Sequence, residues 1–347
     1  MRKRIGILTG GGDCPGLNAA IRATAKIAFS MDYEVIGIRD GWEGLLQCKT
    51  EVLDGFKTSG IIDQGGTILG ASRTSPLQVQ NGPKLVLDTF KELELEALVV
   101  LGGDGTLTAT SMLFDMGLPV VGIPKTIDND VEGTDYAIGF QTAVQIATDA
   151  LDRLRSTAAS HHRVMILEVM GRHSGWIATY AGMGSGADAI LIPEIPMDEE
   201  RIEGLCRMLK ERNSVGLKYS IVVVAEGTIL QGKAITKPGL DTEGGGQSPR
   251  LGGVGQVLAG LIEREARLGT RVSSLGYIQR GGSPVAYDRN LATVFGGKAM
   301  ELVKQRRYGQ MTALKGNRIT GVPLAKAAGQ IKTVDLAVYR TAERFFG

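Results

Sequence analysis

Residues 4–30 read RIGILTGGGDCPGLNAAIRATAKIAFS, and this stretch decides the fold class. The run Arg4–Thr9 is short, apolar and rich in β-branched residues, which predicts a buried strand. A glycine-rich turn follows. Pro15–Ser30 then has the pattern of a helix, since proline suits the first helical turn and Asp13 can approach the unsatisfied amides there. A strand, a glycine turn and a helix in this order are typical of α/β proteins.

The same alternation continues along the chain. Further strands are predicted at Glu34–Ile38, Ala97–Leu101, Pro119–Ile123, Arg163–Val169, Ala189–Ile192 and Tyr219–Ala225. Helical patterns lie between most of them, one of them at Thr142–Ser156. Continuous apolar strands that alternate with helices predict doubly wound parallel sheets covered on both faces. Ligands of such sheets bind beyond the carboxyl ends of the strands, so we expect the chemistry in those loops.

Composition excludes several classes of protein. With 347 residues, the chain has room for one large or two ordinary domains. Its 39 basic and 37 acidic side chains nearly balance, so no overall field favours nucleic acid or a membrane as partner. No apolar run reaches spanning length. Cys14, Cys48 and Cys206 are too widely spaced for a disulfide framework or a zinc site, and a cytoplasmic location is expected.

Two glycine-rich loops have the composition of phosphate-binding loops. In Gly10–Gly16, glycines allow backbone amides to approach an anion, and the helix start adds a partial positive charge. The alternative is a plain strand-to-helix turn. In Gly102–Thr106, Asp104 could reach a magnesium ion that bridges phosphates. The alternative for Asp104 is a helix N-cap.

A third loop, Pro124–Asp130, follows the strand Pro119–Ile123. Thr126, Asp128 and Asp130 occupy alternate positions and would project to one side if the segment is extended. Phosphoryl transfer needs positioning, charge neutralisation and a base near the attacking hydroxyl, and Asp104 and Asp128 could divide the last two duties. A turn rich in Asp and Asn is the alternative.

Seven motifs resemble the phosphofructokinase family, in the family's order, between about residue 4 and residue 305. They are GGDCPGLNAAIR, GGTILGASR, GGDGT, PKTIDND, RVMILEVMGRHSGW, VVVAEGT and LGYIQRGGSPVAYDR. The resemblance implies a glycolytic 6-phosphofructokinase, which transfers the γ-phosphate of Mg·ATP to the 1-hydroxyl of fructose 6-phosphate. It also implies two doubly wound parallel-sheet domains with the active site in the cleft between them. We expect a larger nucleotide-binding domain at 1–139 with 255–305, and a smaller fructose 6-phosphate domain at 140–254 with 306–347.

The resemblance also implies roles for single residues. Asp128 matches the general base, Thr126 and Asp130 help to position it, and Arg172 contacts the sugar and the transferring phosphate. Asp104 matches the magnesium-associated carboxylate. The residues implied at the ATP site are Gly11, Gly12, Arg73, Thr74, Gly103, Asp104, Gly105 and Thr106. The residues implied at the sugar phosphate are Thr126, Ile127, Asp128, Arg163, Met170, Gly171, Arg172, Glu226, Arg271, Tyr277 and Arg280.

The resemblance implies that the 6-phosphate is held by Arg163, Arg271 and Arg280, because guanidinium groups donate paired hydrogen bonds to a phosphate. In the family, the positions of Arg163 and Arg271 reach in from a neighbouring subunit. The resemblance therefore implies a homo-oligomer with shared active sites, a tetramer or else a dimer. Tyr277 departs from the family pattern, since many members have histidine there. Trp42 stands either near the adenine side of the nucleotide or in the core.

Two positions bear on the phosphoryl donor, and they conflict. Gly105 stands where pyrophosphate users carry an aspartate, which favours ATP. Lys125 stands where bacterial ATP enzymes have glycine and pyrophosphate users have lysine. We give Gly105 more weight, because an added negative charge excludes ATP whereas a flexible lysine can adjust. ATP is therefore the predicted donor, with pyrophosphate as the alternative.

Other hypotheses remain at this point. A regulator could bind nucleotide or sugar phosphate without catalysis, although the trio Asp104, Thr126 and Asp128 speaks against it. Another sugar or lipid kinase could share the GGDGT loop, but the arginines at 163, 271 and 280 disfavour it. The glycine-rich stretch Gly227–Gly255 is predicted to be a surface excursion, and Thr333–Phe346 a terminal helix.

Overall fold

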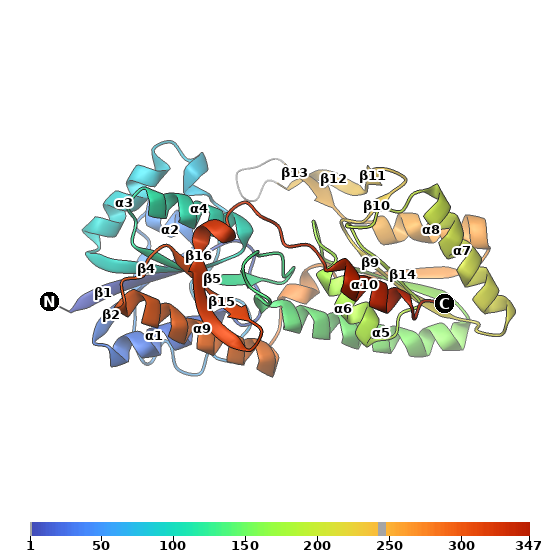
Figure 1. Ribbon diagram of the computed structural model, residues 1–347, viewed down its shortest axis with the longest axis horizontal. Helices are drawn as coiled ribbons and strands as arrows, with labels where there is room; N and C mark the ends of the chain where they lie inside the picture. The colour runs from blue at the N-terminus through green and yellow to red at the C-terminus, as the bar shows by residue number, and fades with distance from the viewer. Residues whose placement is uncertain (1, 242–247) are drawn as a thin grey trace. The chain divides into compact units, whose positions relative to one another are not determined.

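A computed structural model describes residues 2–241 and 248–347, which form two compact units (Figure 1). The first unit comprises residues 2–142 and Arg280–Ile331. Its strands are β1 (Lys3–Thr9), β2 (Tyr33–Ile38), β3 (Thr50–Leu53), β4 (Leu95–Gly102), β5 (Val120–Thr126), β6 (Ile138–Gly139), β15 (Gln310–Lys315) and β16 (Arg318–Pro323). Its helices are α1 (Leu17–Ser30), α2 (Trp42–Leu46), α3 (Gly82–Glu92), α4 (Asp104–Asp115) and α9 (Ala286–Lys304).

The second unit comprises residues 143–241, 248–279 and 332–347. Its strands are β7 (Val164–Val169), β8 (Ala189–Leu191), β9 (Ser220–Ala225), β10 (Ile229–Leu230), β11 (Lys233–Ala234), β12 (Thr236–Asp241), β13 (Ser248–Leu251) and β14 (Thr270–Ser274). Its helices are α6 (Trp176–Gly184), α7 (Glu199–Ser214), α8 (Val254–Ala266) and α10 (Leu336–Glu343), with most of α5 (Phe140–His161).

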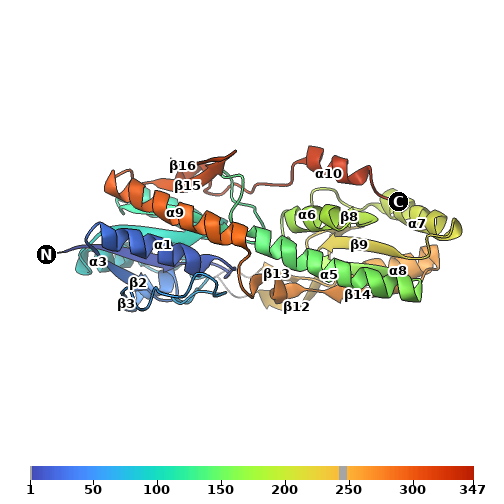
Figure 2. The ribbon, with the colours of Figure 1, turned by 90° about the horizontal axis from the view of Figure 1, so that it is seen from below.

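The main sheet of the first unit runs in the order β16-β15-β5-β4-β1-β2-β3. The neighbours from β15 to β2 pair in parallel, while β3 and β16 close the two edges by antiparallel pairing. α3 and α4 cover one face, and α1 and α9 lie side by side on the other (Figure 2). The predicted doubly wound α/β class is confirmed, with antiparallel strands only at the edges.

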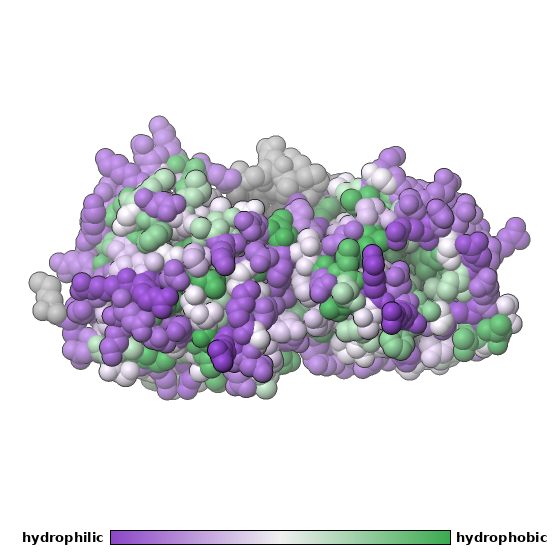
Figure 3. All heavy atoms as spheres, viewed as in Figure 1, coloured by the Kyte–Doolittle hydropathy of each residue, from purple (hydrophilic) through white to green (hydrophobic). Residues whose placement is uncertain are grey.

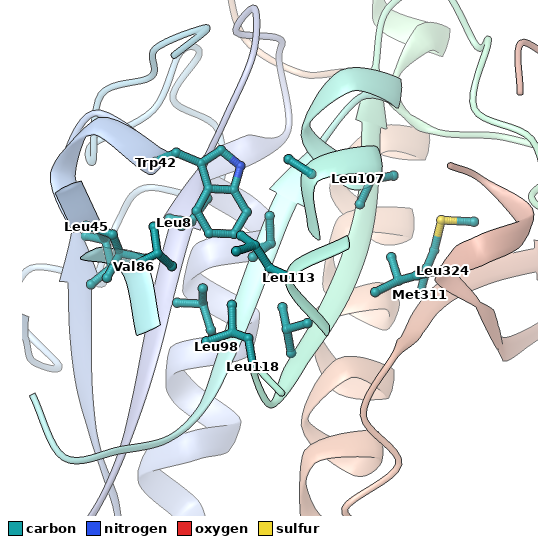
Figure 4. Packing of buried hydrophobic residues seen from close by; sticks show 14 of the residues in the cluster. Leu8, Trp42, Leu45, Val86, Leu98, Leu107, Leu113, Leu118, Met311 and Leu324 are labelled. Carbon is teal, nitrogen blue, oxygen red and sulfur yellow. The ribbon is translucent and has the colours of Figure 1, made fainter. Parts of the chain in front are cut away.

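One hydrophobic cluster of the first unit lies between the sheet and the layer of α2, α3 and α4. Trp42 is 1% exposed and packs there beside Leu98 and Leu113 (Figure 4). Of the two alternatives for Trp42, the structure therefore supports the core tryptophan. Burial of a side chain this large contributes more apolar area than most other residues, so Trp42 is a main stabilising contact of this layer.

The second unit has a parallel sheet in the order β14-β7-β9-β8. One face packs against α7 and α8 through a cluster that includes Ile166, Leu209, Val222 and Leu258. α6 covers the other face, where Gly182 lies against Ile190 of β8. This unit is therefore a second α/β layer structure with its own core.

The units divide the chain differently from the predicted domains. Residues 255–279 belong to the second unit, because β14 pairs with β7. Residues 306–331 belong to the first, because β15 pairs with β5. The predicted domain boundary between residues 139 and 140 lies close to Thr142, where the first segment of the first unit ends. Strand pairing between distant segments decides these assignments, and no local pattern reports it.

Three local predictions need adjustment. The first helix begins at Leu17 with Gly16 as its N-cap, so Asp13 does not cap it. Within Gly227–Gly255 the structure has two antiparallel pairs, β10 with β11 and β12 with β13, and the predicted Glu243–Gln247 part of this loop lies outside the described residues. The terminal helix is confirmed as α10 but is shorter than Thr333–Phe346.

The surface in Figure 3 is mainly hydrophilic over the first unit, with hydrophobic residues in small separate areas. Among the described helices, none has the length and apolar character that a bilayer crossing requires.

Candidate active site

The three loops selected from the sequence lie together at the carboxyl ends of neighbouring strands in one sheet. They follow β1, β4 and β5, which are consecutive neighbours in the sheet and run parallel. The carboxyl ends of parallel neighbours meet at the same edge, where open α/β sheets bind ligands. The structure thus brings together Gly10–Gly16, Gly102–Thr106 and the segment Thr126–Asp130.

Thr106 joins the first two loops. A Cβ atom on Gly10 would lie 2.8 Å from Thr106 Cγ2, and one on Gly102 would lie 2.3 Å from it. Glycine at both positions is what allows this threonine to sit between the loops. Gly11 has φ of 77°, in the left-handed region that other residues rarely adopt. The glycines of these loops are therefore required by the local geometry.

Lys125 is the main correction to the sequence analysis. Its side chain is only 2% exposed, and Nζ donates hydrogen bonds to the carbonyl oxygens of Gly10 at 2.8 Å and Gly12 at 2.6 Å. Burial lowers the pKa of this ammonium from 10.5 to about 8. We expected a flexible lysine beside the donor phosphates. The structure shows instead a lysine inside the protein that ties β5 to the first glycine loop.

Asp104 is the first residue of α4, and Gly103 is the N-cap residue. The helix has no side-chain cap, so the predicted alternative role for Asp104 is not the one observed. Its Oδ1 lies 3.5 Å from the hydroxyl of Thr108. Gly105, next to it, is exposed, and a Cβ added there would meet nothing within 4 Å. The helix start beside Gly105 is therefore open to an anion.

Burial alternates along the third loop. Ile127, Asn129 and Val131 are fully buried, whereas Thr126, Asp128 and Asp130 are partly accessible. Thr126 Oγ1 accepts a hydrogen bond from the amide of Asp128 at 3.1 Å. Buried and partly accessible residues thus alternate along this loop, although its backbone is not extended at Asn129, which has φ of 51°.

Two arginines lie at the same edge of the first unit. Gly10 forms a parallel bridge with Ser72, and the amide of Gly11 donates to Ser72 O at 2.8 Å, which sets Arg73 and Thr74 directly beyond the first loop. Arg280 donates to the carbonyl of Asp13 at 3.1 Å, and its Nε is buried without a hydrogen-bond partner within the described ranges. This Nε–H is a donor suited to an anion.

In the second unit, the predicted sugar-binding segments also meet. Met170–Arg172 follows β7 and Glu226 follows β9, its parallel neighbour. The amide of Glu226 donates to Val169 O at 2.8 Å, and that of Gly227 to Gly171 O at 3.0 Å. Gly171 has φ of 144°, and a Cβ there would lie 2.6 Å from Ser174 O. Only glycine fits that position.

Arg163 and Arg271 lie at the other end of this sheet. Arg163 precedes β7, and Arg271 stands near the start of β14, opposite Met165. A strand of this length spans roughly 20 Å at ~3.3 Å per residue. Within the second unit these two arginines are therefore separate from Met170–Arg172 and Glu226. Tyr277 is 65% exposed.

A family model matches this architecture. The model described as Phosphofructokinase matches residues 4–303. The chain belongs to the phosphofructokinase family. The family match covers most of both units and all seven motifs of the resemblance, and it ends before β15, β16 and α10.

Among the relatives of this phosphofructokinase, one is named ATP-dependent 6-phosphofructokinase 3, from Streptomyces coelicolor. It is 50% identical over 98% of this chain and 99% of its own length. A second protein of that organism, named pyrophosphate–fructose 6-phosphate 1-phosphotransferase, is 47% identical over 99% of this chain and 100% of its own length. The solved phosphofructokinase of Saccharomyces cerevisiae has a TM-score of 0.82 and 31% identity, over 94% of this chain. This chain spans 45% of the yeast chain.

Two features of the site escaped the sequence analysis. The internal position of Lys125 cannot be read from a lysine that stands between Pro124 and Thr126 in the sequence. The role of Asn129 has a weak sequence signal, because asparagine is one of the few residues that tolerate the left-handed region. An asparagine between two candidate carboxylates was the available indication.

Proposed function

We propose that this chain is an ATP-dependent 6-phosphofructokinase, which forms fructose 1,6-bisphosphate from fructose 6-phosphate. One observation carries the proposal. The loops after three neighbouring parallel strands place two glycine-rich amide clusters, Asp104 and Asp128 at the same edge of one sheet. Polyphosphate binding and activation of a hydroxyl require these two sets of groups together.

In the proposed mechanism, amides of the first two loops and Arg73 bind the donor phosphates. Asp128 accepts the proton of the sugar 1-hydroxyl as that oxygen bonds to the γ-phosphorus; the bond from this phosphorus to the β,γ-bridging oxygen breaks, and ADP leaves. Thr126 holds the Asp128 backbone through its hydroxyl, which accepts from the Asp128 amide. Arg172 would donate to the transferring phosphate, and Asp130 would help to position the base.

Asp104 and donor oxygens would hold Mg²⁺, which supplies charge neutralisation of the phosphates when bound. The residues fit this ion, because Mg²⁺ takes one or two carboxylates together with substrate oxygens. Within residues 2–241 and 248–347, no group of three His, Cys, Asp or Glu side chains forms an all-protein metal site. Asp104 is partly accessible beside the open position of Gly105, which leaves room for the nucleotide.

The choice of donor rests on local residues, because the two Streptomyces relatives carry different donor names at similar identity. Gly105 leaves open the space that an aspartate would fill with negative charge. The ammonium of Lys125 is bonded to Gly10 and Gly12 and is buried, so it is not exposed to a donor. Both observations support ATP.

For the acceptor, we propose that Met170–Arg172, Glu226, Tyr277 and Arg280 bind fructose 6-phosphate, while residues of the first unit bind the nucleotide. The position of Arg163 and Arg271 at the opposite end of the second sheet supports their use by a neighbouring subunit. A homo-oligomer with shared sites follows, and a tetramer is the proposed form.

The cysteines are free thiols, which fits a cytoplasmic location.

A coupled assay with purified protein tests the proposal. Fructose 6-phosphate is supplied with Mg·ATP or with pyrophosphate, and fructose 1,6-bisphosphate is identified as the product. A higher kcat/KM with ATP is expected. A higher value with pyrophosphate would reassign the donor, and binding of fructose 6-phosphate without turnover would point to a non-catalytic regulator. A different phosphorylated product would reassign the acceptor.

A further inference from the structure

We infer that Asn129 is a positioning residue of the active site, which holds the backbone between Asp128 and Asp130 in the geometry that presents both carboxylates. The inference rests on the proposed function, since Asp128 is its general base. Asn129 has no exposed surface. It therefore acts from inside the protein and has no accessible atoms for a substrate to meet.

Both ends of the Asn129 side-chain amide are used by one neighbouring segment. Nδ2 donates to the carbonyl oxygen of Asp135 at 3.2 Å. Oδ1 accepts from the amide of Ala137 at 3.0 Å. A buried amide that is satisfied at both ends fixes the distance and the direction between two segments. The loop Thr126–Asp130 is thereby tied to residues 135–137.

That second segment is itself anchored on the sheet. The amide of Asp135 donates to Leu314 O at 2.9 Å, and Asp135 Oδ2 accepts from the amide of Gly316. Thr134 Oγ1 donates to Tyr136 O and accepts from the amide of Leu314 at 3.0 Å. Leu314 belongs to β15, which is paired in parallel with β5. The third loop is thus tied back to the sheet from which it departs.

Backbone conformation gives a second reason for asparagine at this position. Asn129 has φ of 51°, in the left-handed region where asparagine and glycine are favoured over other residues. Glycine could adopt this conformation but would supply neither hydrogen bond. Aspartate could accept from Ala137 but, when ionised, could not donate to Asp135, and it would put a third carboxylate between Asp128 and Asp130. Asparagine alone meets both requirements.

The consequence concerns the chemical step more than binding. The left-handed residue separates two partly accessible carboxylates, and the buried Oδ1 of Asp130 accepts no hydrogen bond from the described residues. Release of the amide contacts would leave the direction of Asp128 undefined relative to a bound hydroxyl. Misplacement of a base by about 1 Å can cost on the order of a hundredfold in rate.

Asn129→Gly is the decisive variant, because glycine can adopt the same left-handed conformation while both side-chain hydrogen bonds are lost. We expect kcat with fructose 6-phosphate to fall by about 10- to 100-fold, with each KM within about threefold of the parent value. Tyr339→Phe is the matched control. It removes a buried hydrogen bond to Ile190 O in the second unit, far along the chain from this loop. It should lower the unfolding temperature and leave kcat unchanged.

A double-mutant cycle separates positioning from general destabilisation. Thr134→Val releases the same segment from the other side, so its effect on kcat and that of Asn129→Gly should not add, because both act through residues 135–137. Equal kcat in Asn129→Gly and the parent would overturn the inference. Strictly additive effects in the cycle would also overturn it.

Hydrogen exchange provides a readout that needs no turnover. Peptides that cover residues 126–137 should exchange faster in Asn129→Gly and unchanged in Tyr339→Phe. If the parent protein phosphorylates no sugar, the proposed function fails, while faster exchange in the variant would still show that Asn129 holds this loop. If the parent is active and exchange in the variant is unchanged, only the role of Asn129 fails.

Discussion

Replacing Gly105 with aspartate should lower activity with ATP far more than activity with pyrophosphate. Gly105 lies in the first turn of α4, is exposed, and has no atom within 4 Å of an added Cβ. In the proposed ATP site, the new side chain would extend into the space that the family resemblance assigns to the nucleotide's α-phosphate. Pyrophosphate lacks that group, so it would be spared most of the repulsion.

The size of the effect follows from charge and distance. Two unit charges about 5 Å apart, at an effective dielectric constant of about 40 for an exposed site, repel by roughly 1.7 kcal/mol. This corresponds to a loss of about 15- to 20-fold in kcat/KM for ATP. The fold should tolerate the change, since a carboxylate in the first helical turn stabilises a helix by about 0.3–1 kcal/mol.

The assay measures kcat/KM for both donors in the parent, Gly105→Asp and Gly105→Asn. Asparagine has nearly the size of aspartate without its charge, so it reports the steric part alone. We expect the parent to prefer ATP, Gly105→Asp to lose most of that preference, and Gly105→Asn to lie between them. Equal losses with the two donors in Gly105→Asp would refute the reasoning.

Three further predictions concern other parts of the site. Asp128→Asn should lower kcat by about 10²- to 10⁴-fold with little change in KM for fructose 6-phosphate, and steady-state kinetics that show nearly intact turnover would remove the proposed base. Lys125→Met removes an ammonium whose pKa falls from 10.5 to about 8 on burial. Between these pH values the unfolded chain binds more protons than the folded one, so the free energy of unfolding of the parent should rise relative to that of the variant by up to about 3 kcal/mol from pH 8 to pH 10.5. Denaturant titrations measure this difference, and a difference that stays constant with pH would contradict the prediction. We expect Arg163→Ala and Asp128→Asn each to be nearly inactive alone. Co-expression of the two variants should restore activity, since a site could then combine Asp128 of one chain with Arg163 of another. Isolated mixed oligomers that stay inactive would argue against shared sites.

Local patterns predicted the central strands well. β1, β2, β4, β5, β7, β8 and β9 each overlap a predicted strand, because a strand buried on both faces is a continuous apolar run. The strands that were missed are at sheet edges or in short hairpins, such as β14 with Arg271 and two serines. An edge strand is only partly buried, so its composition resembles that of a loop.

The candidate site divides in a similar way. Glycine-rich loops and their acidic residues were identifiable, because close backbone approach and phosphate chemistry restrict the residue types at those positions. Lys125 was placed in the right loop but given the wrong environment. Its direction depends on the carbonyl oxygens of Gly10 and Gly12, which are more than a hundred residues away in the chain.

The sequence by itself determined the α/β class, the three loops after β1, β4 and β5, and the candidate carboxylates Asp104 and Asp128. Those features depend on periodicity and residue chemistry within short windows. Only the tertiary structure decided that β14 joins the second unit, that Lys125 is internal, and that Asn129 connects its loop to residues 135–137. The reason is physical: these outcomes depend on which distant backbone groups satisfy one another's hydrogen bonds, and such pairing leaves no mark on the residues next to them.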